Sequence, residues 1–178
     1  MIGEETFHPD TRALLAYGRA LAGSGAPPPK KGGADQVLER LFVIERMKDG
    51  RWPLRTFGAE LVKLFGRDLK ENDFAKLWLE PDLKLMTALI DAASAAGEPG
   101  IARVTAETAD ARRLGAELLI TPLRVEPRFG DRFLGMFQSL GGDAFLDGRP
   151  IVRLRLGSLH PPEAKTPKPG VRLVVVND

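Results

Sequence analysis

The chain has few side chains with which it could perform chemistry. Its 178 residues include two histidines, His8 and His160, and no cysteine. Without cysteine, a thiol nucleophile, a disulfide and a thiolate ligand for zinc or an iron–sulfur cluster are all excluded. We expect both histidines to lie in segments that flank the folded body, where they cannot build a catalytic triad or a metal site. The sequence therefore predicts a protein that is not an enzyme and that holds no metal.

Charged side chains are numerous, but the two signs are balanced. The chain carries 26 Lys and Arg against 24 Asp and Glu, and we interpret the scattered acidic residues as a solvated surface. The net charge is −2 over residues 34–145 and +3 over residues 146–178. Because nucleic-acid-binding domains concentrate Lys and Arg on the folded body, this distribution argues against a nucleic-acid partner. The basic tail instead suits an acidic partner or a membrane surface.

The sequence shows no segment for membrane insertion or export. It contains no apolar run of the length that a transmembrane helix needs. The acidic residues 1–5 lack the basic and apolar blocks of a signal peptide. We therefore expect a cytoplasmic protein.

Composition divides the chain into three parts: a flanking helix with a Pro/Gly linker (1–33), a folded domain (34–145) and a basic, Pro-rich extension with strand-like runs (146–178). The flanking helix is predicted from Thr11 to Ala22, with Asp10 as its N-cap. The linker at 23–33 is too rich in Pro and Gly to form a helix or a central strand.

The folded domain alternates between strand and helix patterns. Asp49-Gly50 marks a hairpin, Gly66 is placed to end a short helix, and Pro81 to begin a long one. The predicted elements, in order, are strands at 41–47 and 51–57, helices at 59–65, after Asn72 or Asp73, and at 81–97, and strands at 100–107, 113–124 and 131–140. This order indicates an α+β fold in which a five-stranded antiparallel sheet carries one helical crossover.

The last predicted strand is apolar on both faces. Phe133 and Phe137 lie on one side, and Leu134 and Met136 lie on the other. One face packs on the crossover helices, so the other face needs a cover. The N-terminal helix, the tail or a second subunit would provide it, and we expect a homodimer.

Residues 58–69 carry the most specific motif of the sequence. Gly58 is followed, after six residues, by Phe65-Gly66-Arg67-Asp68-Leu69. Together with the order of the elements, this motif resembles a PAS domain, and in particular a bacterial family of stand-alone PAS proteins, over residues 34–140. The resemblance implies the PAS fold, in which the sheet curves around a pocket, and a sensory or interaction role.

The same resemblance implies a component of signal transduction. The sequence contains no kinase histidine box, no nucleotide-binding loop and no helix-turn-helix motif. We therefore expect the protein to act by contacting another signalling protein, such as a histidine kinase of a two-component pathway. The alternative is a sensor in which a small molecule in the pocket switches that contact.

Apolar residues of the crossover and the sheet are the candidates for the pocket lining: Phe57, Leu61, Phe65, Phe74, Trp78, Met86, Leu118 and Ile120. They fit either an apolar ligand pocket or an ordinary packed core. The lack of a conspicuous buried polar residue favours the core. Haem-binding PAS domains use an axial histidine and flavin photoreceptors of this fold use a cysteine, so the composition disfavours both groups. We expect no bound cofactor.

Two charged pairs are candidate partner contacts. Arg67 and Asp68 suit a partner contact or a gate at the pocket mouth. The alternative is that Asp68 caps the following turn or pairs with Arg67 at the surface. Arg153 and Arg155 alternate with the aliphatic residues of the tail, so we expect them on one face of a strand whose other face carries Val152, Leu154 and Leu156. The tail either covers the outer face of the sheet or adds a strand to a partner. In both cases its aliphatic side is expected to dock.

Overall fold

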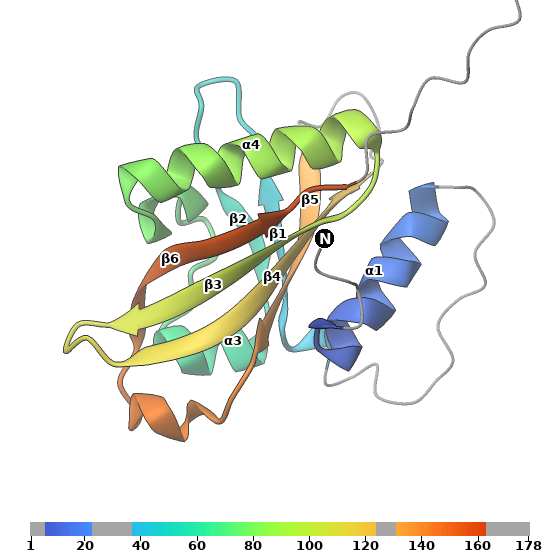
Figure 1. Ribbon diagram of the computed structural model, residues 1–178. Helices are drawn as coiled ribbons and strands as arrows, with labels where there is room; N and C mark the ends of the chain where they lie inside the picture. Colours follow the sequence, from blue (N-terminus) through green and yellow to red (C-terminus); the bar gives the residue numbers. More distant parts are fainter. Residues whose placement is uncertain (1–5, 23–36, 124–130, 163–178) are drawn as a thin grey trace, which may run out of the picture.

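The structure, a computed structural model, describes residues 6–22, 37–123 and 131–162 (Figure 1). Its elements, in chain order, are α1 (Pro9–Ala22), β1 (Leu41–Glu45), β2 (Leu54–Phe57), α3 (Ala59–Phe65), the 3₁₀ helix η2 (Phe74–Leu77), α4 (Glu80–Ala96), β3 (Gly100–Thr108), β4 (Arg113–Leu123), β5 (Arg132–Ser139), the 3₁₀ helix η3 (Asp143–Leu146) and β6 (Ile151–His160). The predicted linker and the strand-like run at 171–176 lie outside the described residues. Among the described helices, none is both long enough and apolar enough to cross a membrane.

The strands form one antiparallel sheet in the order β2-β1-β5-β4-β3-β6 (Figure 1). The predicted α+β architecture is confirmed, but the sheet has six strands rather than five. The sixth strand comes from the extension and runs beside β3, from Thr108 opposite Ile151 to Ile101 opposite His160. For residues 151–160 this corrects both alternatives given for the tail. The segment neither covers a face of the sheet nor adds a strand to a partner, because it pairs with β3 at the edge of its own sheet.

Local signals position the crossover as the sequence predicts. Gly66 ends α3 with φ 68° and donates its N–H to the carbonyl of Lys63, a conformation that glycine adopts without strain. Asp73 caps η2 through its carboxylate, which accepts the Ala75 N–H at 3.1 Å. Pro81 lies in the first turn of α4, and Gly97 ends the helix at φ 66°.

The start of α1 differs from the prediction. Asp10 was expected as the N-cap of a helix that starts at Thr11, but the helix begins two residues earlier, at Pro9. The cap position is therefore His8, whose ring Nδ1 accepts the Asp10 N–H at 3.2 Å. Proline is favoured in the first turn of a helix because it has no N–H to satisfy there. Asp10 is left free to use its carboxylate elsewhere.

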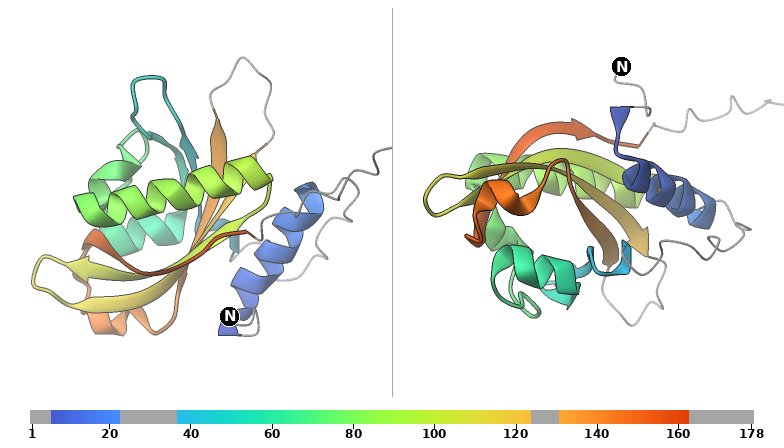
Figure 2. Two further views of the ribbon diagram at one scale, coloured as in Figure 1. Left: turned by 45° about the horizontal axis from the view of Figure 1, so that its top comes forward. Right: turned by 90° about the horizontal axis from the view of Figure 1, so that it is seen from below.

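The sheet separates two apolar clusters. The inner cluster packs on the crossover helices and contains alternate residues of β4, from Leu114 to Ile120, which were expected to share a face. The outer cluster consists of Phe7, Leu15, Ile101, Leu119 and Met136, so α1 and the residues before it cover this face. Figure 2 shows α1 on the side of the sheet opposite to α3. Of the covers expected for the outer face, the N-terminal helix is the one that the structure shows.

The crossover also makes hydrogen bonds with both edge strands of the sheet. At the β2 edge, the Leu54 N–H donates to the Asn72 carbonyl at 2.9 Å, and the Glu71 N–H donates to the Leu54 carbonyl at 2.7 Å. At the β6 edge, the Leu156 N–H donates to Oδ2 of Asp82 at 3.1 Å. Addition of a partner strand at these positions would have to displace a bond that the chain already makes.

One side chain of β6 lies on a different face from the one expected. Val152 was grouped with Leu154, but Val152 is 46% exposed and Leu154 is 1% exposed. Glu107 lies opposite Arg153 while Thr108 lies opposite Ile151, so Val152 is an extra residue in the ladder. Such a bulge shifts the alternation of side chains along the strand.

Candidate functional site

The predicted pocket lies between the inner face of the sheet, α3 and η2. Its residual cavity has a volume of about 10 Å³. The cavity is lined by Phe42, Leu54, Phe57, Leu61, Phe65, Phe74, Leu77, Leu118, Phe137 and Leu154. A single water needs about this much space, and small-molecule pockets typically reach several hundred Å³. In this conformation the interior is a packed core.

The predicted lining residues fall into two groups. Phe57, Leu61, Phe65, Phe74 and Leu118 border the cavity, whereas Trp78, Met86 and Ile120 belong to the same core without bordering it. The rings of Phe57 and Phe65 meet edge to face at 5.5 Å between centroids, a favourable packing for aromatic pairs. Sequence reasoning missed five further lining residues, which the pairing of strands and the packing of η2 bring to the cavity: Phe42, Leu54, Leu77, Phe137 and Leu154.

Flavin and haem do not fit this interior. Every residue that lines the cavity is apolar, so none offers a side-chain hydrogen bond or a metal ligand. Among the core residues that the structure describes, Trp78 is the one whose buried polar side-chain atom, Nε1, has no partner. One indole donor outside the cavity lining cannot orient a large polar ring system.

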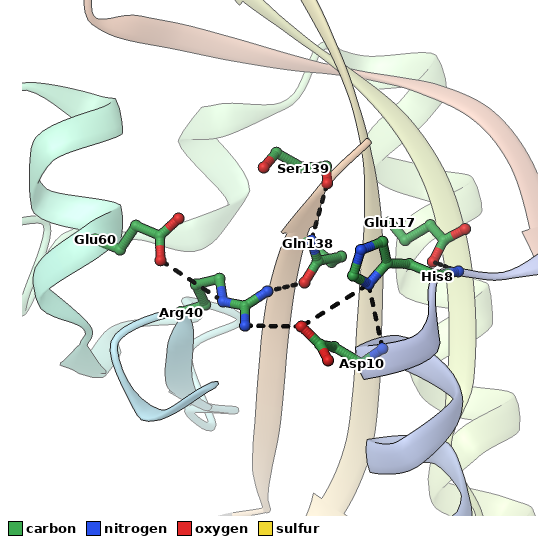
Figure 3. Close-up of polar contacts among 7 residues, drawn as sticks. All are labelled: His8, Asp10, Arg40, Glu60, Glu117, Gln138 and Ser139. Atoms are coloured by element: carbon green, nitrogen blue, oxygen red, sulfur yellow. Dashed lines mark hydrogen bonds and ion pairs between the residues drawn. The ribbon is translucent and has the colours of Figure 1, made fainter. Parts of the chain in front are cut away.

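A polar network joins α1 to the body of the protein (Figure 3). Its centre is Arg40, whose side chain is 9% exposed. One guanidinium nitrogen donates to Oδ2 of Asp10 at 2.9 Å, and another donates to Oε1 of Gln138 on β5. The Arg40 Nε lies 3.6 Å from Oε2 of Glu60 on α3. A single cation therefore connects α1, the sheet and a helix that borders the cavity.

A buried carboxylate anchors the start of α1 in the same region. Glu117 of β4 is 1% exposed, and its Oε2 accepts the His8 N–H at 3.0 Å. Its Oε1 lies 3.8 Å from the Arg103 guanidinium. A negative charge is favourable at the N-terminus of a helix, where backbone N–H groups are unpaired. The interpretation of the acidic residues as a solvated surface is wrong here and at Glu45 and Glu107, which are also buried beside arginines.

Both histidines lie in the folded body, contrary to expectation. His160 ends β6 and packs edge to face on Phe7 at 5.0 Å between ring centroids. Burial and the Arg103 charge lower the pKa of His160, while the Glu117 carboxylate opposes that shift. Among the described residues there is no cluster of three or more His, Cys, Asp or Glu side chains that could hold a metal ion.

The candidate partner contacts lie on separate parts of the surface. Asp68 accepts the Lys70 N–H at 2.8 Å, as expected of a residue that caps a turn. Arg153 donates to the buried Glu107 at 3.2 Å, and Arg155 reaches Asp82 on α4 at 3.1 Å. The two tail arginines are therefore engaged with the chain itself.

Comparisons with known proteins agree with this architecture. A sequence model of the PAS domain matches residues 6–138, which is more than half of the chain. No curated protein matches the sequence significantly. Solved structures with a similar backbone include an RNA-binding light-oxygen-voltage receptor, with 13% identity and a TM-score of 0.48 over 70% of this chain and 39% of that one. A LOV protein from Rhodobacter sphaeroides has 16% identity and a TM-score of 0.47 over 63% of this chain and 67% of that one.

Proposed function

The chain belongs to the PAS domain family, and from this premise we propose that it is a non-catalytic signalling protein that acts by contact with another protein. PAS domains are signalling modules, so a role in signal transduction follows from the family. The proposal adds that the partner is a histidine kinase of a two-component pathway and that the contact takes place in the cytoplasm.

The observation that carries this proposal is the filled interior. A residual cavity of about 10 Å³ leaves space for about one water, so a signal that enters through the core would require the core to expand. Contact at the surface requires no such change. The bonds already made at Leu54 and Leu156 disfavour strand addition at these positions of the two edges, so we expect a partner to use faces and grooves of the domain.

A homodimer is part of the proposal. The expectation of a second subunit was based on the apolar outer face of the sheet, and this face is covered by Phe7 and Leu15. Light scattering of the full chain measures the oligomeric state directly. A dimer that persists when residues 1–33 are deleted would place the interface away from α1.

Binding to purified histidine kinases of the source organism tests the central proposal. We expect one kinase to bind with a dissociation constant in the micromolar range or below, and its autophosphorylation to change on binding. Native mass spectrometry of the purified chain is the second measurement. A retained small molecule together with no kinase binding would contradict the proposal and favour the small-molecule sensor.

A further inference from the structure

A groove of about 430 Å³ lies between the β1–β2 loop and the outer side of α4. It is lined by Arg46, Met47, Lys48, Gly50, Trp52, Ala75, Leu83, Thr87 and Asp91. In Figures 1 and 2 the loop that joins β1 to β2 rises beside α4. The groove falls within the size range of small-molecule sites, whereas the interior cavity of about 10 Å³ does not.

Arg46 spans the groove and is held in place from several sides. Its guanidinium lies over the Trp52 ring, 4.6 Å from the centroid, and makes an ion pair with Asp91 of α4. Its backbone N–H donates to the Asp131 carbonyl at 2.8 Å. The Nε atom is nevertheless buried without a hydrogen-bond partner among the described residues. A buried donor without a partner is costly. The Arg46 side chain as a whole is 31% exposed, so an anion in the groove can approach its charge.

The groove carries one positive charge that the described residues do not balance. Asp49, the acidic residue of the loop, is paired with Arg51 at 2.7 Å. Lys48 is exposed and makes no ion pair with any residue that the structure describes. The lining therefore has two cations, Arg46 and Lys48, against the single carboxylate of Asp91. An anionic ligand group complements this balance.

Most of the remaining lining is apolar, apart from Gly50 and Thr87, whose hydroxyl donates to the Leu83 carbonyl at 2.9 Å. Leu83, Ala75 and Met47 are half-buried, and Trp52 is 8% exposed. The backbone of Trp52 is fixed on both sides, because its N–H donates to Asp73 at 3.1 Å and its carbonyl accepts the Phe74 N–H at 2.9 Å. These walls can receive an apolar group without rearrangement.

We propose that this groove binds a carboxylate that is carried on an apolar body. The carboxylate lies between Lys48 and Arg46, and the apolar body packs on Leu83 and Met47. The carboxylate comes either from a free amphipathic acid or from an acidic side chain flanked by apolar residues in a peptide. Ligand binding at this site does not require a kinase partner, so this proposal and the proposed function can be tested independently.

The two tryptophans of the chain make a selective test possible, because Trp52 lines the groove and Trp78 lies in the core. In ¹H–¹⁵N spectra of the full chain, 4-phenylbutyrate should shift the indole signal of Trp52 and leave that of Trp78 unchanged. The neutral amide of the same acid should bind about tenfold more weakly, since it cannot make a charge-assisted contact. Acetyl-Leu-Glu-Leu-amide, titrated in parallel, distinguishes a peptide source from a free acid.

Charge variants complete the design. Lys48→Gln should weaken binding several-fold without changing the melting temperature, because Lys48 is exposed. Lys63→Gln, an exposed lysine on α3, is the matched control and should bind like the parent chain. The proposal is overturned if neither probe shifts Trp52 at millimolar concentration, if only Trp78 responds, or if the two lysine variants lose affinity equally. Kinase binding that survives these failures would leave the proposed function intact.

Discussion

Replacement of Trp78 by alanine should destabilise the fold by about 3 kcal/mol, near the lower limit for removal of a large buried aromatic side chain. The side chain is 6% exposed, and its ring packs against Phe74 at 5.7 Å between centroids, so its loss leaves a cavity in the core. The expected cost stays near the lower limit because the indole Nε1 is buried without a partner among the described residues. An unpaired buried donor costs about 1–3 kcal/mol, and the alanine variant no longer carries it.

The same reasoning ranks two variants of this position. Trp78→Phe keeps the ring contact and removes the unpaired N–H, so it should cost less than about 1.5 kcal/mol. Urea unfolding followed by circular dichroism gives both values, and Leu85→Ala, at an exposed position of α4, is the control. If the phenylalanine variant were as unstable as the alanine variant, the indole N–H would have a partner and the reasoning would be wrong. An unchanged midpoint for Trp78→Ala would show that the indole is not part of the core.

Three further outcomes follow from the packing, the tail and the half-buried His160. Gly135→Ala should cost about 1–3 kcal/mol in chemical unfolding, because an added Cβ would lie 2.0 Å from Cζ of Phe42, and Gly115→Ala, with more room, should cost less. Leu154→Ser should destabilise the fold by more than about 2 kcal/mol, because Leu154 is a core residue. Arg153→Gln should cost about 0–1 kcal/mol, because the Arg153 side chain is half-exposed. The opposite ranking would contradict docking of β6 through its aliphatic residues. The fold lowers the pKa of His160 below 6.5, so the unfolded chain takes up the proton first as the pH falls through that value. The melting temperature should therefore decrease as the pH is lowered from about 7.5 to 5.5. The decrease should be smaller for His160→Gln.

The sequence predicts those parts of the fold that depend on neighbouring residues. Gly66 and Gly97 end their helices where expected, and alternation along β4 assigns Leu118 to the inner face and Leu119 to the outer face. Such signals are local, because one or two residues determine the backbone conformation or the face.

The parts that could not be predicted depend on residues far apart in the sequence. The residues near Glu117 in the sequence do not indicate that it is buried, because its partners are His8, which precedes α1, and Arg103 of β3. The groove could not be predicted for the same reason, because Asp91 and Arg46 form their ion pair only when the crossover packs on the sheet. The pairing of β6 with β3 likewise depends on an edge left open by another part of the chain.

The hydrogen bonds between the crossover and both edge strands have a consequence for hydrogen exchange. In most open sheets the outward-facing amides of the edge strands contact water and exchange early. Here the amides of Leu54 and Leu156 are bonded to Asn72 and Asp82, at opposite ends of a single connecting segment. The amides of Leu54 and Leu156 should therefore exchange together, when the segment between residues 71 and 82 detaches, rather than independently of each other.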